Sequence, residues 1–417
     1  MNTPADFVEL TAKVTCLAPR APAAAALEFL TESTVPLLHE PFAPERLAAL
    51  AALSKALLKD PTLRLDPSTV ALAYWLRPAN LETLRQEALR TEPARTVRTP
   101  AGVVFHIAPA NVDTLFVYSW ALSFLCGNLN VVRLSTSTSW VVEAILQVLA
   151  GLAEAEPAPW RGNVFVTYPH DDAVTGWFSQ RCDQRIVWGG DETIARIRSV
   201  ALKPHAAERA FASKFSASVL DAVTLHAASA EELRRIASLL ARDIGPFGQK
   251  ACSSPHVLYW IGGDVAANRG LAARFSDAVA ADLRGGKASD VGDAVWRIEQ
   301  GFLLAADGIA RDLKCAAGLA VAEIDAALPP VERMEIGAGF LSHRFVPSVE
   351  AVAQEATTRH QTLTYYGLDD AACARLAREA GKRGVDRIVP VGSALEFDAV
   401  WDGFALLNDF TRQVAVR

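Results

Sequence analysis

The stretch GVVFHIA, residues 102–108, decides the fold, because it has the composition of a short strand buried on both faces. It ends at Pro109-Ala110-Asn111, and an apolar helix is expected from about Thr114 to Cys126. The same rhythm then repeats: strands are predicted at 130–134, 163–167 and 185–188, and helices at 139–152, 171–179 and 191–198. Strands and helices alternating at this spacing form βαβ units. The sequence therefore predicts an α/β fold with a parallel, doubly wound sheet that binds ligands at the carboxyl ends of its strands.

Helices precede this sheet, and a second α/β unit follows it. The second unit is predicted to contain helices at 230–242, 265–283 and 370–380, and strands at 256–261, 319–323, 342–346, 362–366 and 387–391. Gly285 or Gly286 is expected to end the helix 265–283, and residues 327–330 are expected to form a loop. The sequence therefore predicts that the chain has four parts. They are a helical N-terminal segment (1–90), a dinucleotide-binding domain (91–221), a catalytic domain (222–395) and a C-terminal segment (396–417). The last is expected to return to the cofactor domain or to contact another subunit, since residues 413–416 read as an edge strand.

Composition limits the classes of function. A chain of 417 residues exceeds the roughly 250–300 residues at which one core stops growing, so two packed domains are expected. A net charge of −6 with scattered basic residues argues against nucleic acid as a partner. The six cysteines show neither CxxC nor Cys/His ligand spacing, which disfavours zinc and disulfides and fits a reducing cytoplasm. No signal peptide or membrane span is predicted.

The loop FGQKACSSPH, residues 247–256, carries one cysteine among small residues. Such residues leave the sulfur of Cys252 accessible and allow backbone N–H groups to point at it, which suits a nucleophile. The alternative, a small buried apolar residue, is about equally common for a free cysteine. His256, four residues later, is interpreted as structural rather than as a base, and Trp140, Trp260 and Trp296 are expected in the core.

Three further loops follow strands of the first sheet. The side-chain amide of Asn111 could stabilise an oxyanion, and the backbone of Ile107, Ala108 and Pro109 could run beside a nicotinamide. Arg133, with Ser135 and Thr136, offers a cation and two hydroxyls to an adenosine ribose and its phosphate. Gly189 and Gly190 precede a helix whose first N–H groups could receive a pyrophosphate. Each signal alone is more often an ordinary turn or a solvated charge.

The order of these motifs resembles the aldehyde dehydrogenase superfamily, and specifically its LuxC-type acyl-CoA reductase branch. The similar stretches extend from about residue 97 to the end, and QKACSSP and WDG are the branch-specific ones. They are HIAPAN (106–111), GNLNVVRLS (127–135), WGG (188–190), QKACSSP (249–255), QT (361–362) and WDG (401–403). The resemblance implies an aldehyde-dehydrogenase-like fold and a thioester reductase. It assigns Cys252 as the acyl-accepting nucleophile, Asn111 and the Cys252 backbone N–H as the oxyanion hole, and Arg133 as the counterpart of the family's cofactor-binding lysine.

Two departures from the superfamily pattern refine this expectation. Hydrolytic members carry a Glu-Leu-Gly-Gly-Lys strand whose glutamate activates water, and the comparable residues 210–214 place Ala210 at the position of the glutamate. NAD-preferring members carry a carboxylate three residues after the strand-end lysine, and this chain has Thr136 there. Removing that carboxylate removes repulsion against a 2′-phosphate, and Arg133 adds attraction, so NADPH is favoured.

The resulting hypothesis is a cytoplasmic enzyme that reduces an acyl thioester, from acyl-CoA or an acyl-carrier protein, to an aldehyde with NADPH. The chain is expected to form a homo-oligomer and to work with an acyl-transferring or acyl-activating partner enzyme. Two alternatives are a hydrolytic aldehyde dehydrogenase and a noncatalytic subunit that holds acyl groups within a larger biosynthetic complex.

Overall fold

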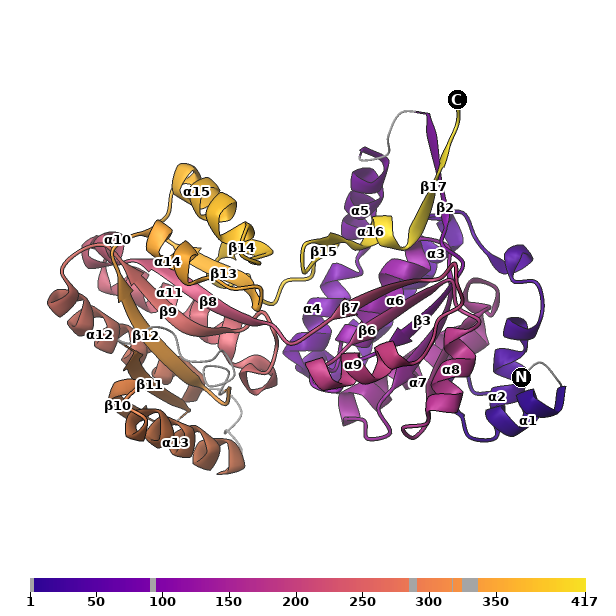
Figure 1. Cartoon of the computed structure of the whole chain (residues 1–417), viewed down its shortest axis with the longest axis horizontal. Coiled ribbons are helices and arrows are strands. Elements are labelled where there is room, and N and C mark those ends of the chain that lie inside the picture. The colour runs from indigo at the N-terminus through magenta and orange to yellow at the C-terminus, as the bar shows by residue number, and fades with distance from the viewer. Residues whose placement is uncertain (1–3, 91–94, 285–290, 317, 325–336) are drawn as a thin grey trace. The chain divides into compact units, whose positions relative to one another are not determined.

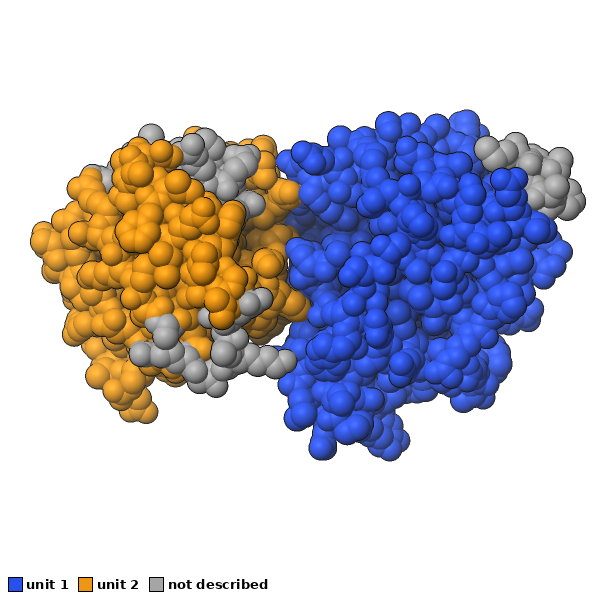
Figure 2. Space-filling model, turned by 90° about the horizontal axis from the view of Figure 1, so that it is seen from below, with its two compact units in different colours: residues 1–212, 397–417 blue, residues 213–396 orange. Residues whose placement is uncertain are grey.

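The computed structural model describes residues 4–90, 95–284, 291–316, 318–324 and 337–417. The chain forms two compact units: unit 1 comprises residues 1–212 and 397–417, and unit 2 comprises residues 213–396 (Figure 2). The sequence analysis placed this boundary after residue 221, but it lies after residue 212. The reason is that residues 215–221 form a strand of the second sheet. The expected helix end at Gly285 or Gly286 and the loop at 327–330 lie outside the described residues.

Unit 1 is built on a six-stranded sheet with the order β1-β5-β4-β3-β6-β7. Its strands are β1 (Thr15–Ala18), β3 (Val103–Ile107), β4 (Leu129–Leu134), β5 (Asn163–Thr167), β6 (Gln184–Trp188) and β7 (Ala207–Phe211). The strands β3 to β7 run parallel, and β1 is antiparallel to β5. The order reverses between β3 and β6, as in doubly wound dinucleotide-binding folds, so the predicted sheet is confirmed. All five residues of β3 are buried, which explains their continuous apolar run.

Helices cover both faces of this sheet (Figure 1). On one face, α8 (Asp172–Ser179) and α9 (Asp191–Ser199) pack with α1 (Pro4–Thr11) and α2 (Ala23–Leu27) against the odd-numbered residues of β3. The other face carries α6 (Leu115–Leu125) and α7 (Trp140–Ala155), with α3 (Pro44–Lys59) packed on both of them. The predicted helical N-terminal segment is present, with α4 (Pro67–Trp75) and α5 (Pro78–Arg90), and it also contributes β1, which the sequence reading did not foresee.

The C-terminal residues return to unit 1. They form β15 (Val400–Trp401), β16 (Phe404–Ala405), α16 (Leu406–Asp409) and β17 (Thr411–Ala415). The strand β17 pairs antiparallel with β2 (Thr96–Pro100), and the two lie side by side as a ribbon (Figure 1). The guanidinium of Arg98 in β2 donates to Asn408 Oδ1 and Thr411 Oγ1, at 2.8 and 3.0 Å. The predicted edge strand at the C-terminus thus has a partner within its own chain.

Unit 2 contains a seven-stranded sheet with the order β10-β11-β12-β9-β8-β13-β14. Its strands are β8 (Phe215–Asp221), β9 (Pro255–Ile261), β10 (Ala310–Ala316), β11 (Leu319–Ile324), β12 (Phe340–Val346), β13 (His360–Tyr366) and β14 (Arg387–Pro390). All are parallel to their neighbours except β10. The sequence reading missed β8, although it lies next to the strand that follows Cys252, because two serines interrupt its apolar run.

Two helical layers enclose this second sheet as well. One face packs against α11 (Ala230–Ile244) and α12 (Val265–Arg284), which follow the short α10 (Ala222–Ala227). The opposite face packs against α14 (Val349–Glu355) and α15 (Asp370–Gly381), and α13 (Val291–Ala306) covers β10 and β11. No helix in the described part of the chain is long and apolar enough to cross a membrane.

The three tryptophans expected in the core have different surroundings. Trp260 is fully buried and donates from Nε1 to His343 Nδ1 at 2.9 Å. Trp140 and Trp296 remain 49% and 48% exposed, so the prediction was wrong for both. Each lies on the outward side of a helix that packs against the sheet with its other side. The residue type alone does not show which side of the helix a tryptophan occupies.

Candidate active site

The loop before Cys252 has an unusual backbone that one buried side chain secures. Phe247, Gly248 and Gln249 take φ values of 56°, 58° and 61°, a left-handed conformation that only glycine adopts at low cost. The fully buried Gln249 donates from Nε2 to the carbonyl oxygens of Pro255 and Phe340, at 2.7 and 3.0 Å. Its Oε1 accepts from the N–H groups of Gly339 and Phe340, both at 3.0 Å. Gln249 therefore fixes the loop to β9 and β12.

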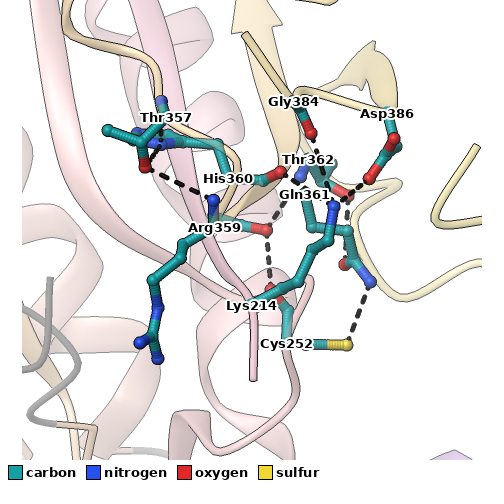
Figure 3. A network of polar contacts seen from close by, with 10 residues as sticks. Lys214, Cys252, Thr357, Arg359, His360, Gln361, Thr362, Gly384 and Asp386 are labelled. Atoms are coloured by element: carbon teal, nitrogen blue, oxygen red, sulfur yellow. Dashed lines mark hydrogen bonds and ion pairs between the residues drawn. The ribbon is translucent and has the colours of Figure 1, made fainter. Parts of the chain in front are cut away.

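Cys252 itself is half-buried, and hydrogen bonds reach both its sulfur and its carbonyl oxygen (Figure 3). The side-chain amide Nε2 of Gln361 donates to Cys252 Sγ at 3.1 Å. The hydroxyl of Ser216, in β8, donates to the carbonyl oxygen of Cys252 at 2.7 Å. The sulfur thus faces a polar hydrogen-bond donor.

The other cysteines have less reactive surroundings or lie elsewhere in the fold. Burial raises the pKa of Cys16 to about 11 and the pKa of Cys126 and Cys182 to about 12. Burial also raises the pKa of Cys373, and Cys315 is exposed on β10. Because a thiolate is the nucleophilic form, these shifts disfavour those four thiols as nucleophiles.

Two histidines lie on the strands around Cys252, and both are neutral at physiological pH. His256 is the second residue of β9, and burial lowers its pKa to about 4. His360 begins β13 and has its pKa lowered to about 4 by the same cause. His256 is therefore a weak base, which agrees with its interpretation as a structural residue.

Lys214 lies at the start of β8 and holds together the segments that lead into β13 and β14. Its ammonium forms an ion pair with Asp386 and donates to the carbonyl oxygens of His360 and Gly384, both at 3.4 Å (Figure 3). Ala210, four residues earlier, lies in β7 and packs half-buried against the core of unit 1. No carboxylate occupies that position, as the sequence shows.

In unit 1, the predicted cofactor residues gather at one edge of the sheet. Ile107 ends β3 and Ala108 follows it, Arg133 belongs to β4, and Gly189 and Gly190 follow β6. Since β4, β3 and β6 are adjacent and parallel, their carboxyl ends share this edge. A small pocket opens between the loops after β3 and β4; its lining includes Pro109, Ala110, Val112, Asp113, Ser135, Ser137, Thr138 and Ser139.

Arg133 is half-buried at this edge, and its guanidinium is directed toward the end of β5. Its Nη2 donates to the carbonyl oxygen of Tyr168 at 3.3 Å, and its Cζ lies 5.3 Å from the centre of the Tyr168 ring. Burial lowers the pKa of Arg133, although arginine stays charged. Thr136 and Asn111 are exposed on the two neighbouring loops.

The glycines after β6 form the start of α9. Gly190 is its N-cap and makes no side-chain hydrogen bond, so the first N–H groups of the helix have no capping side chain. A Cβ at Gly189 would lie 3.1 Å from Thr193 Cγ2, so a larger residue there would require a small shift of Thr193. Asp191 and Glu192 begin the helix, and their carboxylates work against an anionic pyrophosphate at this position.

The structure thus places the sequence-predicted residues in two groups, the cofactor residues with Asn111 in unit 1 and Cys252 in unit 2. Sequence reasoning assigned no role to Gln249 or Gln361, although both stand in the quoted motifs. The role of a buried amide is revealed by the groups that it binds. Gln249 binds Phe340 and Gln361 binds Cys252, and both of these partners are distant in sequence.

Comparisons with known proteins agree on one superfamily. The sequence profile of "Acyl-CoA reductase (LuxC)" matches residues 80–413. A search of curated proteins finds no match to this chain.

Solved structures with a similar fold are aldehyde dehydrogenases. Lactaldehyde dehydrogenase from Escherichia coli is 15% identical, with 99% of this chain and 91% of that chain covered and a TM-score of 0.64. Glyceraldehyde-3-phosphate dehydrogenase GapN from Methanocaldococcus jannaschii, complexed with NADP, is 14% identical, with 94% and 92% covered and a TM-score of 0.64. An aldehyde dehydrogenase from Mycobacterium tuberculosis, complexed with NAD+, is 14% identical, with 95% and 89% covered and a TM-score of 0.62.

The family profile spans most of the chain, and the fold neighbours share its two α/β units. This chain therefore belongs to the acyl-CoA reductase (LuxC) family and is an oxidoreductase with the aldehyde dehydrogenase fold.

Proposed function

We propose that this enzyme reduces an acyl thioester to an aldehyde with NADPH, through a covalent acyl-enzyme at Cys252. The observation that carries the proposal is the setting of Cys252, a half-buried thiol on a constrained loop whose sulfur accepts a hydrogen bond from an amide. Acyl-CoA and acyl-carrier protein both present the same thioester, so either one fits this chemistry.

The first half of the reaction uses the thiolate of Cys252. Its sulfur attacks the thioester carbonyl, a new C–S bond forms, and the donor's thiolate leaves with the electron pair of the broken bond. The exchange of one thioester for another is nearly isoenergetic, so it needs positioning and charge stabilisation rather than a strong base. The backbone N–H of Cys252 and the amide of Asn111 are proposed to stabilise the oxyanion.

The second half requires a hydride donor. When bound, NADPH would supply a hydride to the carbonyl carbon of the acyl-cysteine. The tetrahedral alkoxide formed in this way would re-form its C=O bond as the C–S bond breaks, the electron pair of that bond would return to the sulfur of Cys252, and the aldehyde would depart. The position that carries a general base in hydrolytic relatives is Ala210 here, so the acyl-enzyme lacks that route to a free acid.

The unit 1 edge fits a dinucleotide phosphate. The pocket between the β3 and β4 loops is lined by several hydroxyls, and Arg133 supplies a cation at the adjoining strand end. Thr136, on the loop after β4, carries no negative charge, which supports NADPH over NADH. Three carboxylates oppose a phosphate: Asp113 lines the pocket itself, and Asp191 and Glu192 lie on the β6 side of the edge.

A panel of acyl-CoA substrates, followed by NADPH absorbance, tests the proposal. Reduction that is lost in Cys252→Ala, with NADPH binding retained, supports it. Aldehyde-dependent reduction of NADP+ without CoA would instead favour a hydrolytic dehydrogenase, and inactivity with every donor would favour an acyl-holding subunit. The expected partners, a second copy of the chain and an acyl-supplying enzyme, are separate proposals that size analysis and co-purification test.

A further inference from the structure

We propose that Gln361 is a catalytic residue whose amide N–H stabilises the sulfur of Cys252 as a thiolate. The contact that motivates this assignment is the 3.1 Å hydrogen bond from Gln361 Nε2 to Cys252 Sγ (Figure 3). The role rests on the proposed function, in which Cys252 is the nucleophile.

Irregularities in two strand pairings direct Gln361 toward the sulfur. The register between β13 and β8 shifts between His360 and Leu363, so Gln361 and Thr362 lie inside the irregularity. The register between β8 and β9 also shifts, next to Ser216. Bulges of this kind re-aim side chains and are common beside active sites.

A second path ties the same strand to the backbone of Cys252. The N–H of Thr362 donates to Ser216 Oγ at 3.1 Å, and Ser216 Oγ donates to the carbonyl oxygen of Cys252 at 2.7 Å. The position of Gln361 relative to Cys252 is therefore fixed from both the side chain and the main chain. Such a fixed donor suits stabilisation of a charge that appears and disappears during a reaction.

The orientation of the Gln361 amide is also determined by its surroundings. The residue is 3% exposed, and its Oε1 accepts from Thr362 Oγ1 at 3.4 Å. Its own carbonyl oxygen accepts from the N–H of Asp386 at 2.9 Å. With the oxygen engaged by Thr362, the NH2 group faces the sulfur. An amide NH2 is a donor only, so it bonds a thiolate more strongly than a thiol.

Several charged and titratable groups lie on the segments that adjoin Cys252. His256 on β9 and His360 on β13 are neutral near pH 7, so neither provides an imidazolium for the thiolate. The ammonium of Lys214 on β8 is bound to Asp386 and to two carbonyl oxygens. Lys250 lies on the cysteine loop and Arg359 precedes β13.

Lys214 then acts as a positioning residue rather than a catalytic one. Its bond to the carbonyl oxygen of His360 fixes the residue before Gln361, and its ion pair with Asp386 fixes the residue whose N–H binds the Gln361 carbonyl. Through these contacts Lys214 holds the strand that presents the amide.

The amide would act twice in one turnover. Before acylation it stabilises the negative sulfur that attacks the thioester. After hydride transfer, when the C–S bond breaks and the electron pair returns to sulfur, it stabilises the same thiolate as a leaving group. Gln361 therefore affects kcat more than the KM for the acyl donor.

The test measures alkylation of individual cysteines by iodoacetamide in the full chain, between pH 6 and 10, with peptide mass spectrometry. In the wild type, Cys252 is expected to react faster at pH 7 than the exposed Cys315, although Cys252 is half-buried. Gln361→Met keeps the side-chain length but removes the donor. It is expected to slow Cys252 alkylation at pH 7 roughly 10- to 100-fold, the effect of losing a hydrogen bond to a charged group.

Thr364→Val is the matched control. Thr364 lies in β13, as Gln361 does, and the substitution breaks the buried hydrogen bond between its hydroxyl and that of Ser218 in β8. It should leave the pH profile of Cys252 unchanged. An unchanged profile in Gln361→Met, or a wild-type Cys252 that reacts more slowly than Cys315 at pH 7, would overturn the proposal. The second comparison needs no variant and so does not depend on how Gln361→Met folds.

Alkylation requires neither cofactor nor acyl donor, so this test is independent of the proposed function. A shifted profile without any reductase activity would reject the reaction and keep the contact. Normal reduction with an unshifted profile would reject the role of Gln361 alone.

Discussion

The side chain of Gln249 binds the backbone of Phe340 in both directions, donating to its carbonyl oxygen and accepting from its N–H at 3.0 Å each. Residues 91 positions apart in sequence are thus joined by a single amide. This contact connects the cysteine loop to β12, and it holds the left-handed backbone that precedes Cys252.

Replacing Gln249 with alanine should therefore destabilise unit 2 and disorder the nucleophile. The change removes the amide from four backbone groups, of which the Phe340 N–H keeps a bond to the Gly337 carbonyl oxygen, and each group left unpaired costs about 1 kcal/mol or more. We expect a loss of about 3–5 kcal/mol in the free energy of unfolding, measured with urea, and a fall in kcat. Gln413→Ala, at an exposed position of β17, should change stability by less than about 0.5 kcal/mol. Equal effects of the two substitutions would contradict this role.

Loss of the Asn111 amide should slow catalysis without weakening the fold. Asn111 is exposed on the loop after β3, so Asn111→Ala has little effect on packing. Removal of one oxyanion donor lowers kcat about 10²–10³-fold. Steady-state kinetics with the best acyl-CoA measure the effect, and Asn111→Asp, which keeps the size but loses the donor, should be at least as slow. A kcat near the wild-type value would mean that Asn111 only forms a turn.

Cofactor preference should depend on the charge at position 136. Thr136→Asp places a carboxylate near the strand end that carries Arg133, where it would repel a 2′-phosphate. We expect kcat/KM for NADPH to fall roughly 10- to 100-fold, while the value for NADH is maintained, as for a lost or opposed charge contact. Thr136→Asn has the same size without the charge and serves as the control. Equal losses with both cofactors would show that the residue does not face the phosphate.

Acid should destabilise the protein through its buried histidines. Burial lowers the pKa of four of them to about 4, below the ordinary value near 6.5; they are His106, His256, His343 and His360. Their stabilising contribution is complete above pH 6.5 and is lost as the pH falls toward 4, because the unfolded chain binds protons first. Each histidine contributes a slope of about 1 kcal/mol per pH unit near pH 5.

His256→Leu isolates one of these contributions. The Nδ1 of His256 has no hydrogen-bond partner among the described residues, so an apolar replacement breaks no identified contact there. The variant should lose about one histidine's share of the pH dependence between pH 4.5 and 6.5, measured by urea unfolding at a series of pH values. An unchanged slope would mean that His256 is protonated in the folded protein.

The sequence predicted the alternating architecture better than it predicted the contacts of the site. Continuous apolar runs such as β3 identify buried parallel strands directly, and the glycines after β6 identify the start of α9. The strand β8 escaped because its serines make hydrogen bonds across the sheet, Ser216 to Cys252 and Ser218 to Thr364, and a pattern based on hydrophobicity cannot register such partners.

The roles of Gln249 and Gln361 escaped for a related reason. Cys252 stands out because a thiol has characteristic chemistry, whereas a glutamine has many common uses. Gln361 lies 109 residues after Cys252, and two register shifts bring its amide to the sulfur. Only the pairing of β9, β8 and β13 reveals that relationship.

The fate of the acyl-enzyme in the absence of NADPH tests the direction of the reaction. Mixing enzyme with acyl-CoA alone should give an acyl group on Cys252 that persists, with little free fatty acid, if Ala210 stands where hydrolytic members carry their general base, as the sequence resemblance implies. Intact-mass measurements over time follow the adduct, and peptide mapping should place it on Cys252 and on none of the other five cysteines. Ala210→Glu should shorten its lifetime, by up to about 10²–10⁴-fold where the carboxylate reaches a water beside the acyl carbon.

The result with the wild-type enzyme decides between a reductase and a hydrolase. Rapid release of fatty acid without cofactor would require another base, and His256, with its pKa lowered to about 4, is poorly suited to that task. Such release would identify the enzyme as a hydrolase of thioesters rather than a reductase, whatever the variant does.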